Sequence, residues 1–208
     1  IFGARHAGLG AGIPQEVPML TLSRICGSGV QSIVTGAQMI MLGEAETVVA
    51  GGMENMSQAP HVLRGMRDVY KLARSPKEGT VLEKDMEDYL FTNLLDGMCG
   101  SFMAQTSDEI CKRKGVTREE TDEFAALSHS RTANSIDDGI WEQEIVKVGD
   151  IGHADEDHVV RGSTPESLAE LRTAFGPESL VTAGNASGVV DGAAAVVIKS
   201  ASKASADG

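Results

Sequence analysis

Residues 22–42 read LSRICGSGVQSIVTGAQMIML, and this stretch decides the fold. Its apolar residues after Gln31 fall at positions 33, 34, 37, 40 and 41, which is the spacing of a helix. They spread widely around the helix surface, so we expect a buried helix that begins near Cys26. Residues 47–50 (TVVA) follow and end at two glycines, which predicts a buried parallel strand. A strand, a buried helix and a strand in close succession predict a layered α/β core.

Small residues dominate two segments near the end of the chain. Residues 181–188 read VTAGNASG, a run that lets the backbone approach a ligand or another backbone closely. Residues 192–198 read GAAAVVI and predict a central strand with no room for large side chains at its start.

The middle of the chain is polar and predicts surface helices. Thr106 and Glu109 have the spacing of a helix capping box, and Thr117 and Glu120 repeat it, so a helix is expected to begin at each place. The second helix should run to about Asp137. Residues 144–148 (EIVKV) are strand-like, and residues 153–158 (HADEDH) predict an exposed acidic loop.

Length and charge exclude several classes of protein. The chain has 208 residues, 41% of them apolar, and 18 Lys+Arg against 30 Asp+Glu give a formal charge of −12. This predicts a globular protein with one large domain, or one domain with an insertion. The acidic balance argues against non-specific nucleic-acid binding, and no apolar run reaches the roughly 20 residues of a membrane span. The N-terminus lacks an initiator Met and a signal or transit peptide, so a fragment or a processed form is expected.

The cysteines indicate a reducing compartment. Cys26, Cys99 and Cys111 are an odd number at irregular spacing, which fits neither a disulfide framework nor a zinc site. Such a protein is expected in the cytoplasm rather than outside the cell. No HExxH motif suggests a metal, and the glycines form neither of the common nucleotide-binding motifs.

Cys26 is the leading candidate for a nucleophile. The N-terminus of the predicted helix favours negative charge and therefore the thiolate. Gly27, Ser28 and Gly29 leave space for an acyl group, and their amides can bind a developing oxyanion. The alternative is a cysteine packed in the core as a small hydrophobe. A nucleophilic cysteine needs a base, but none of the histidines lies in a segment that suggests a built site. Each is expected at the surface: His6, His61, His129, His153 and His158.

Three segments resemble the thiolase family, and they occur in the family's order. Residues 22–33 resemble its active-site segment, residues 51–60 (GGMENMSQAP) the segment after it, and residues 181–197 its coenzyme A loop and the next strand. The resemblance implies a thiolase-like layered α/β/α fold with an inserted, mostly helical loop domain. Residues 1–60 would then be part of the N-terminal domain. Residues 61–178 would be the loop domain for substrate and coenzyme A binding. Residues 179–208 would return to the N-terminal domain with the coenzyme A loop and a strand.

The resemblance also implies roles for single residues. Cys26 would take the acyl group, with its own N–H as half of an oxyanion hole. Ser187 would contact the pantetheine amide of coenzyme A, and Phe175 would pack beside the coenzyme. The pantetheine tunnel would be lined by Ala183, Gly184 and Ala186. The acyl pocket would be shaped by Met98 and Met103, and the nucleotide would lie near Ser167 and Arg161. Short-chain biosynthetic members have His-Met-Gly where this chain has residues 102–104 (FMA), so strict acetoacetyl specificity is not implied.

The implied reaction is acyl transfer to and from coenzyme A through an acyl-cysteine. A 3-ketoacyl-CoA and coenzyme A would give an acyl-CoA and acetyl-CoA, or the reverse condensation would occur, within fatty acid metabolism. Coenzyme A is then a substrate. No permanent cofactor, metal, nucleic acid or membrane partner is expected.

The family's C-terminal half supplies acid and base groups through Asn-Glu-Ala-Phe, Gly-His-Pro and Cys-x-Gly motifs, and this chain contains none of these strings. We therefore expect an internal fragment of a thiolase about twice as long. The complete protein should be a homodimer or homotetramer in the cytoplasm or an organelle matrix. Two alternatives stay open: a non-catalytic coenzyme A-binding or structural fragment, and a related condensing enzyme that uses acyl-carrier protein.

Overall fold

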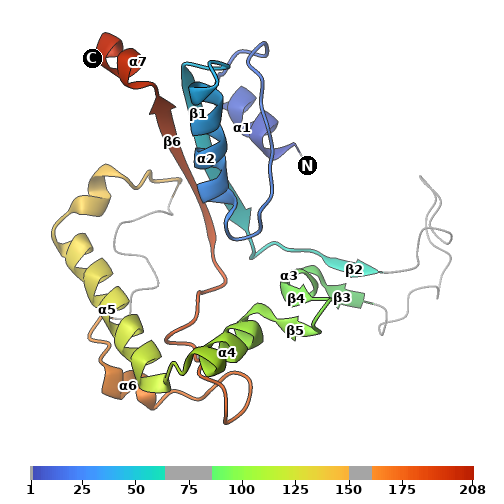
Figure 1. Cartoon of the computed structure of the whole chain (residues 1–208), viewed down its shortest axis with the longest axis vertical. Helices are drawn as coiled ribbons and strands as arrows, with labels where there is room; N and C mark the ends of the chain where they lie inside the picture. Colours follow the sequence, from blue (N-terminus) through green and yellow to red (C-terminus); the bar gives the residue numbers. More distant parts are fainter. Residues whose placement is uncertain (1, 64–85, 150–160) are drawn as a thin grey trace. The chain divides into compact units, whose positions relative to one another are not determined.

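The chain forms two compact units. The computed structural model describes residues 2–63, 86–149 and 161–208 (Figure 1). Unit 1 contains residues 1–58 and 190–208, and unit 2 contains residues 59–189. The return to the N-terminal domain at residue 179 stays a prediction about the family's domains, whereas the second segment of unit 1 begins at residue 190. Residues 179–189 belong to unit 2 because their hydrogen bonds go to its helices. The predicted acidic loop at 153–158 lies outside the described residues.

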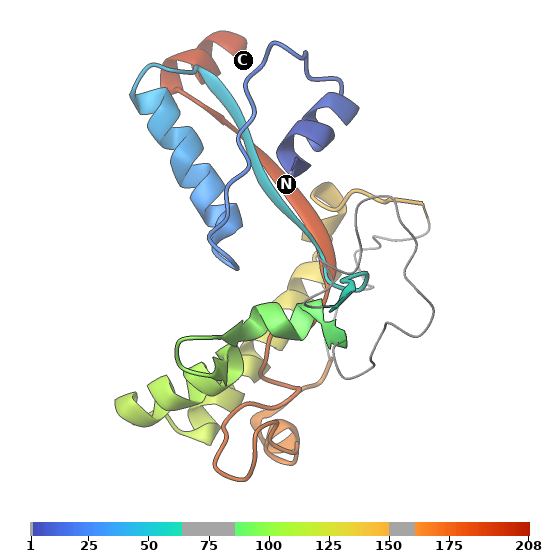
Figure 2. The same ribbon diagram turned by 90° about the vertical axis from the view of Figure 1, so that its right-hand side faces the viewer.

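Unit 1 is built on two long antiparallel strands. Strand β1 (Thr47–Asn55) pairs with β6 (Asp191–Lys199), with Thr47 opposite Lys199. Figure 2 shows the two strands side by side. Both predicted strands are confirmed. The parallel direction of β1 is wrong, and β6 is not central among the described residues, since it pairs with β1 alone. An apolar sequence indicates that a strand is buried, but it does not indicate whether the neighbouring strand is parallel or antiparallel. Because a whole unit is inserted between β1 and β6, the chain can return in either direction.

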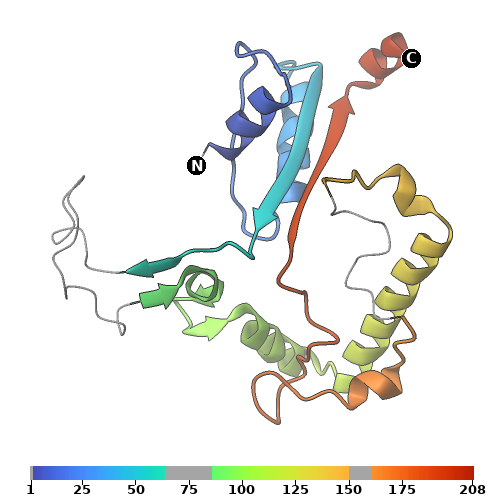
Figure 3. The same cartoon turned by 180° about the vertical axis from the view of Figure 1, so that it is seen from behind.

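Helix α2 (Ser28–Met41) packs on one face of this strand pair (Figures 1 and 3). A Cβ at Gly36 would lie 3.0 Å from a methyl carbon of Val48 and 3.3 Å from one of Ile198, so glycine permits this close approach. The predicted helix is confirmed. Its predicted burial is wrong for this chain, because Gly36 is the only buried residue of α2.

The opposite face of the strand pair is open in places. Val49 and Val197 lie opposite each other on it and are 57% and 63% exposed. The short helix α1 (Gly3–Gly10) reaches the neighbouring side chain of Met53, which a Cβ at Gly3 would touch. Helix α7 (Ala201–Asp207) follows β6, and its Asp207 pairs with Lys199 at 2.6 Å and with Lys203 at 2.8 Å.

Unit 2 is mostly helical, with short hairpins. Strand β2 (His61–Leu63) pairs with β3 (Met86–Asp88), and β4 (Leu95–Asp96) pairs with β5 (Ser101–Phe102). The helices are α3 (Tyr89–Leu94), α4 (Met103–Lys114), α5 (Arg118–Asp137), the 3₁₀ helix η2 (Ile140–Gln143) and α6 (Pro165–Ala169). Ala125 and Ala126 of α5 and Leu168 of α6 form its buried apolar cluster.

The two predicted capping boxes have different outcomes. Thr117 accepts from the Glu120 N–H at 3.2 Å, and the Glu120 carboxylate accepts from the Thr117 N–H at 2.8 Å, so the box at the start of α5 is confirmed. The start predicted at Thr106 is wrong, because α4 begins at Met103. There the Gln105 side chain accepts from the Phe102 N–H at 3.0 Å, so a glutamine supplies the cap. No strand forms at residues 144–148, all of which the structure describes.

Candidate active site

Cys26 lies in a tight turn that leads into α2. The Gly27 N–H donates to the Arg24 carbonyl at 3.0 Å, and the Ser28 N–H donates to the Ile25 carbonyl at 3.1 Å. Ile25 has φ of +50°, a left-handed conformation that is strained for a β-branched side chain. Strain of this kind persists where the surrounding structure enforces it, and it is concentrated at functional sites. Cys26 itself is exposed.

The Ser28 side chain holds this turn closed. Its hydroxyl donates to the Ile25 carbonyl at 2.7 Å and accepts from the Arg24 N–H at 2.8 Å. The Arg24 guanidinium in turn donates to the Gln31 side chain at 2.6 Å, one turn into α2. The sequence predicted only space at Ser28, because the partners of its hydroxyl depend on the backbone turn.

The amides available to an oxyanion differ from those expected. Gly27 and Ser28 use their N–H groups within the turn, so they are not free. The N–H groups of Cys26 and Gly29 have no acceptor among the described residues. This arrangement suits the implied use of the Cys26 N–H as one oxyanion donor.

Glycines bring α2 close to β1 behind the cysteine. A Cβ at Gly52 would lie 3.6 Å from the Gly29 Cα, and a Cβ at Gly51 would strike the Ala194 carbonyl. The Gly52 position is thus in ordinary contact with the start of α2, whereas the collision at Gly51 is with β6. Gly29 and Gly52 therefore let the first turn of α2 lie close to β1, and Gly51 lets β1 lie close to β6.

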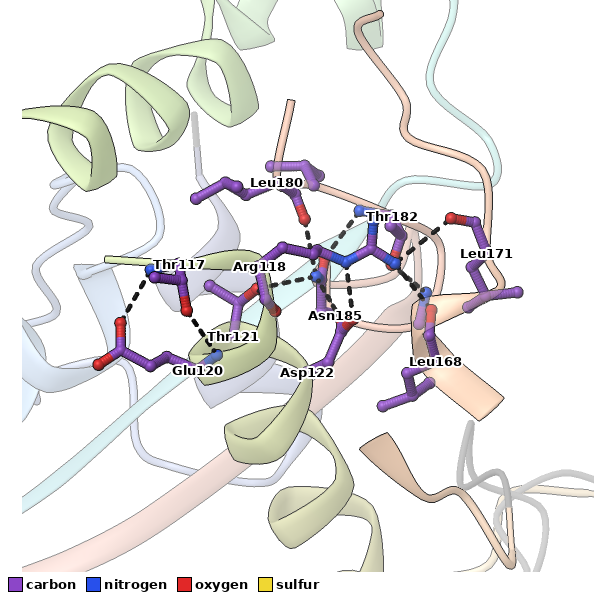
Figure 4. Close-up of polar contacts among 12 residues, drawn as sticks. Thr117, Arg118, Glu120, Thr121, Asp122, Leu168, Leu171, Leu180, Thr182 and Asn185 are labelled. Carbon is purple, nitrogen blue, oxygen red and sulfur yellow. Dashed lines mark hydrogen bonds and ion pairs between the residues drawn. The ribbon is translucent and has the colours of Figure 1, made fainter. Parts of the chain in front are cut away.

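The predicted coenzyme A loop lies in unit 2 and is held by buried polar side chains. Asp108 of α4 accepts from the Leu180 N–H at 2.9 Å, and Asn185 donates to Asp122 of α5 at 3.1 Å (Figure 4). Asp108, Asp122 and Asn185 are not among the residues predicted from the sequence. Asn185 is a polar residue inside a run of small ones, and this was a signal that could have identified it.

The loop residues implied to contact coenzyme A are accessible. Ser187, Ala183 and Ala186 are exposed, and the Ser187 hydroxyl has no hydrogen-bond partner among the described residues. Gly184 is half-buried, and a Cβ there would lie 2.6 Å from a methyl carbon of Leu168 and 2.6 Å from one of Leu171. Packing against Leu168 and Leu171 within unit 2 therefore explains why residue 184 must be small.

Phe175 belongs to an aromatic stack beside the loop. Its ring lies 6.3 Å from that of Phe102, nearly parallel, and Phe102 meets Phe91 edge-on at 6.4 Å. A hollow of about 190 Å³ opens next to Phe175; its other lining residues are Gln105, Asp108, Glu109, Lys112, Glu178 and Ser179. Three of these are carboxylates against one lysine, so the hollow itself does not favour phosphate.

The remaining implied residues lie at different places in unit 2. Met98 is 96% exposed in the turn between β4 and β5, and Met103 is the first residue of α4. Ser167 accepts from the Thr164 N–H at 3.0 Å and completes a capping box at α6, so it has a local structural role. Arg161 pairs with Asp137 at the end of α5 at 3.0 Å.

One histidine contradicts the expected surface placement. His129 is half-buried, and its Nε2 lies 3.2 Å from the Gly184 carbonyl, so it supports the predicted coenzyme A loop. His6 packs near the Phe2 ring, and His61 is the exposed first residue of β2. His153 and His158 lie outside the described residues. No group of three or more His, Cys, Asp or Glu side chains among the described residues could hold a metal ion.

Comparison with known proteins identifies the family. The model of the thiolase N-terminal domain matches residues 2–202. The chain belongs to the thiolase family. It is 40% identical to the acetyl-CoA acetyltransferase of Cupriavidus necator over 208 residues, which is 97% of this chain and 51% of that protein. It is 41% identical to the human mitochondrial 3-ketoacyl-CoA thiolase over 206 residues, with 96% and 50% covered.

Solved thiolase structures match the fold. The human mitochondrial 3-ketoacyl-CoA thiolase in complex with CoA superposes with a TM-score of 0.83 at 39% identity, covering 99% of this chain and 51% of that one. The acetyl-CoA acetyltransferase of Syntrophomonas wolfei superposes with a TM-score of 0.82 at 30% identity. The predicted thiolase-like α/β fold is therefore confirmed. This thiolase chain spans about half the length of the curated relatives it matches. None of its described helices is long and apolar enough to cross a membrane.

Proposed function

We propose that the complete protein containing this chain transfers acyl groups to and from coenzyme A through an acyl-cysteine on Cys26. The Cys26 thiolate attacks the ketone carbonyl of a 3-ketoacyl-CoA, and the bond between its C2 and C3 breaks. The two-carbon carbanion takes a proton and leaves as acetyl-CoA. The thiol of a second coenzyme A then attacks the acyl-cysteine, releasing the acyl-CoA and restoring the thiolate. The condensation of two acyl-CoA molecules is the reverse.

The setting of Cys26 carries this proposal. The thiol is exposed at the entrance to α2, the residue before it is strained, and its own N–H is free of partners among the described residues. A cysteine packed only as a core hydrophobe needs neither exposure nor strain, so the geometry favours the nucleophile.

Unit 2 supports binding of coenzyme A. We assign Ser187 to the pantetheine amide, Ala183, Gly184 and Ala186 to the tunnel, and Phe175 to packing beside the coenzyme. Ser167 lies near the nucleotide, and Met98 and Met103 shape the acyl pocket. The human relative with the matching fold was solved as a complex with CoA, which supports this assignment.

Trapping the acyl-enzyme tests the proposal. The complete protein is incubated with acetoacetyl-CoA, quenched in acid and digested, and we expect one acetyl group on the peptide that contains Cys26. Limited iodoacetamide labelling should modify Cys26 before Cys99 or Cys111. Preferential acylation or labelling of either other cysteine contradicts the assignment.

The same experiment separates the alternatives. A non-catalytic coenzyme A-binding protein would bind the coenzyme without forming the acyl-cysteine. A condensing enzyme that uses acyl-carrier protein would be acylated from the carrier and poorly from acetoacetyl-CoA. Reading the gene beyond Gly208 for Gly-His-Pro and Cys-x-Gly motifs gives an independent answer.

Assembly and location are also part of the proposal. The complete protein is proposed to be a homodimer or homotetramer that acts in fatty acid metabolism, in the cytoplasm or an organelle matrix. Light scattering at micromolar concentration tests the assembly, and a monodisperse monomer contradicts it.

A further inference from the structure

An ion pair between the half-buried Arg118 and the buried Asp122 lies directly beneath the predicted coenzyme A loop. The Asp122 side chain is 1% exposed and accepts from Arg118 Nε at 2.7 Å, one turn earlier on α5. Its other carboxylate oxygen accepts from Asn185 Nδ2 at 3.1 Å, so the pair is joined to the loop (Figure 4). Burying a carboxylate is costly unless it is paired and hydrogen-bonded, and here both oxygens have partners.

The Asn185 amide closes the loop on itself. Its Oδ1 accepts from the Thr182 N–H at 2.8 Å, and its Nδ2 also donates to the Leu180 carbonyl at 2.8 Å. Nδ2 also lies 3.5 Å from the Thr121 hydroxyl oxygen, so the two strongest of its contacts, to Leu180 and Asp122, leave no hydrogen free. The Ala186 N–H donates to the Thr182 carbonyl at 3.1 Å, so the backbone bends back immediately before Ser187.

Arg118 also fixes the wall on which the loop rests. Its Nη2 donates to the carbonyls of Leu168 at 2.7 Å and Leu171 at 3.3 Å (Figure 4). The side chains of these two leucines fill the space beside Gly184. One guanidinium thus connects the leucine wall to the carboxylate that holds Asn185.

We propose that Asp122 and Asn185 are positioning residues that set the place of Ser187 and thereby the affinity for coenzyme A, an inference that rests on the proposed function. Buried ion pairs contribute little net stability compared with apolar packing, whereas they do require one geometry. The contacts of the Asn185 side chain with Thr121, Asp122 and the backbone of Leu180 and Thr182 define the path of residues 180–185. Ser187 follows two residues later and is exposed. Loss of the contacts lets the loop sample other paths, so fewer molecules present Ser187 correctly.

Isosteric exchange in the complete protein tests this role. Asp122→Asn removes the charge that faces Arg118, and Asn185→Asp places a second carboxylate against Asp122. Each single variant should raise KM and Kd for coenzyme A about tenfold or more, with kcat within about threefold. The double variant restores one amide and one carboxylate, so its effect should fall below the product of the single effects by at least about threefold.

Controls separate positioning from general damage to the fold. Asn134→Asp changes an exposed amide on the same helix and should leave KM unchanged. The rate of Cys26 alkylation by iodoacetamide should be the same in all variants. If Asp122→Asn does not fold, Arg118→Lys carries the test, because lysine keeps the charge but cannot reach Asp122 and both carbonyls together.

The outcomes of the two proposals are distinguishable. Unchanged KM and Kd in both single variants, or purely multiplicative effects in the double variant, overturn the positioning role while wild-type acylation of Cys26 stands. Equal losses in kcat and in the Cys26 alkylation rate also overturn it, because they indicate a merely structural role. A wild-type protein that binds no coenzyme A overturns both proposals.

Discussion

The two units of the chain use their side chains in opposite ways. Unit 1 carries Cys26 on an apolar frame whose large side chains are incompletely covered, with Met41 84% and Leu42 74% exposed at the end of α2. Unit 2 carries the predicted coenzyme A loop on a network of buried polar groups in which Asp108, Asp122 and Asn185 all have partners. Large apolar side chains are exposed in unit 2 as well, such as Met98 and Phe124. The difference between the units is that polar contacts within unit 2 hold its loop, whereas close backbone packing of α2 on the strands holds Cys26.

This difference indicates separate tasks. The strained turn at Ile25 and glycine contacts between α2 and β1 hold the exposed thiol of Cys26. Hydrogen bonds beneath an exposed loop fix a surface that can receive a long, flexible ligand. We expect changes in unit 1 to act mainly on chemistry and changes in unit 2 mainly on binding.

The largest expected effect is the loss of chemistry when the nucleophile of unit 1 is removed. Cys26→Ser in the complete protein should lower kcat for acetoacetyl-CoA cleavage by at least about 10⁴-fold, because the hydroxyl is a far weaker nucleophile. Binding of coenzyme A, measured by calorimetry, should stay within about threefold. Cys111→Ser on α4 is the matched control and should retain activity. Substantial turnover by Cys26→Ser would contradict the assignment of chemistry to unit 1 and of binding to unit 2.

Residues 1–208 alone should not catalyse thiolysis. Missing acid and base groups cost about 10²–10⁴-fold each, and none of the five histidines lies in a sequence segment that suggests a built site. The exposed apolar surface of unit 1 should also promote aggregation. The assay compares acetoacetyl-CoA cleavage by this chain and by the complete protein. Turnover within tenfold of the complete protein would mean that the base lies in this chain.

A smaller effect is expected where the loop meets its leucine wall in unit 2. Gly184→Ala places a Cβ against Leu168 and Leu171, so we expect a loss of about 1–3 kcal/mol in the free energy of unfolding. KM for coenzyme A should also rise, since the loop must shift. Gly10→Ala, where a Cβ meets no atom within 4 Å, is the control for urea denaturation. Equal stability of the two variants would contradict the tight packing.

The smallest effect concerns the end of the strand pair in unit 1. Hydrogen bonds from the Ser57 hydroxyl and N–H hold the pKa of Asp191 below its ordinary value. A lowered pKa contributes stability above the unfolded value of about 3.9, and this stability is lost as the pH falls through the folded value. Ser57→Ala should slightly lower the melting temperature at pH 7, with the difference shrinking below about pH 4. Ser205→Ala should show no such pH dependence, and a constant difference for Ser57→Ala would contradict the linkage.

Local patterns were sufficient for the principal helices and strands and for the family. Helical spacing after Gln31 gave α2, β-branched and small residues gave β1 and β6, and the pair Thr117 and Glu120 marked the start of α5. These signals are carried by neighbours in the chain, so they can be read without knowing what packs against them. The small residues around Cys26 and before Ser187 pointed to the thiolase family for the same reason.

Contacts between distant segments could not be read in this way. The antiparallel pairing of β1 with β6 joins residues on either side of an inserted unit. His129 was expected at the surface because its neighbours are polar, yet it meets the Gly184 carbonyl 55 residues later.

The sequence by itself determined helices α2 and α5, strands β1 and β6, the candidate nucleophile Cys26 and the small residues of the predicted coenzyme A loop. Only the tertiary structure decided which groups hold them: the strained Ile25 turn, the pairing of β1 with β6, and the chain of contacts from Arg118 through Asp122 to Asn185. The physical reason is the distance along the chain over which each effect acts. Propensity and periodicity act over a few residues, whereas a buried carboxylate finds its partners wherever the fold brings a donor within about 3 Å.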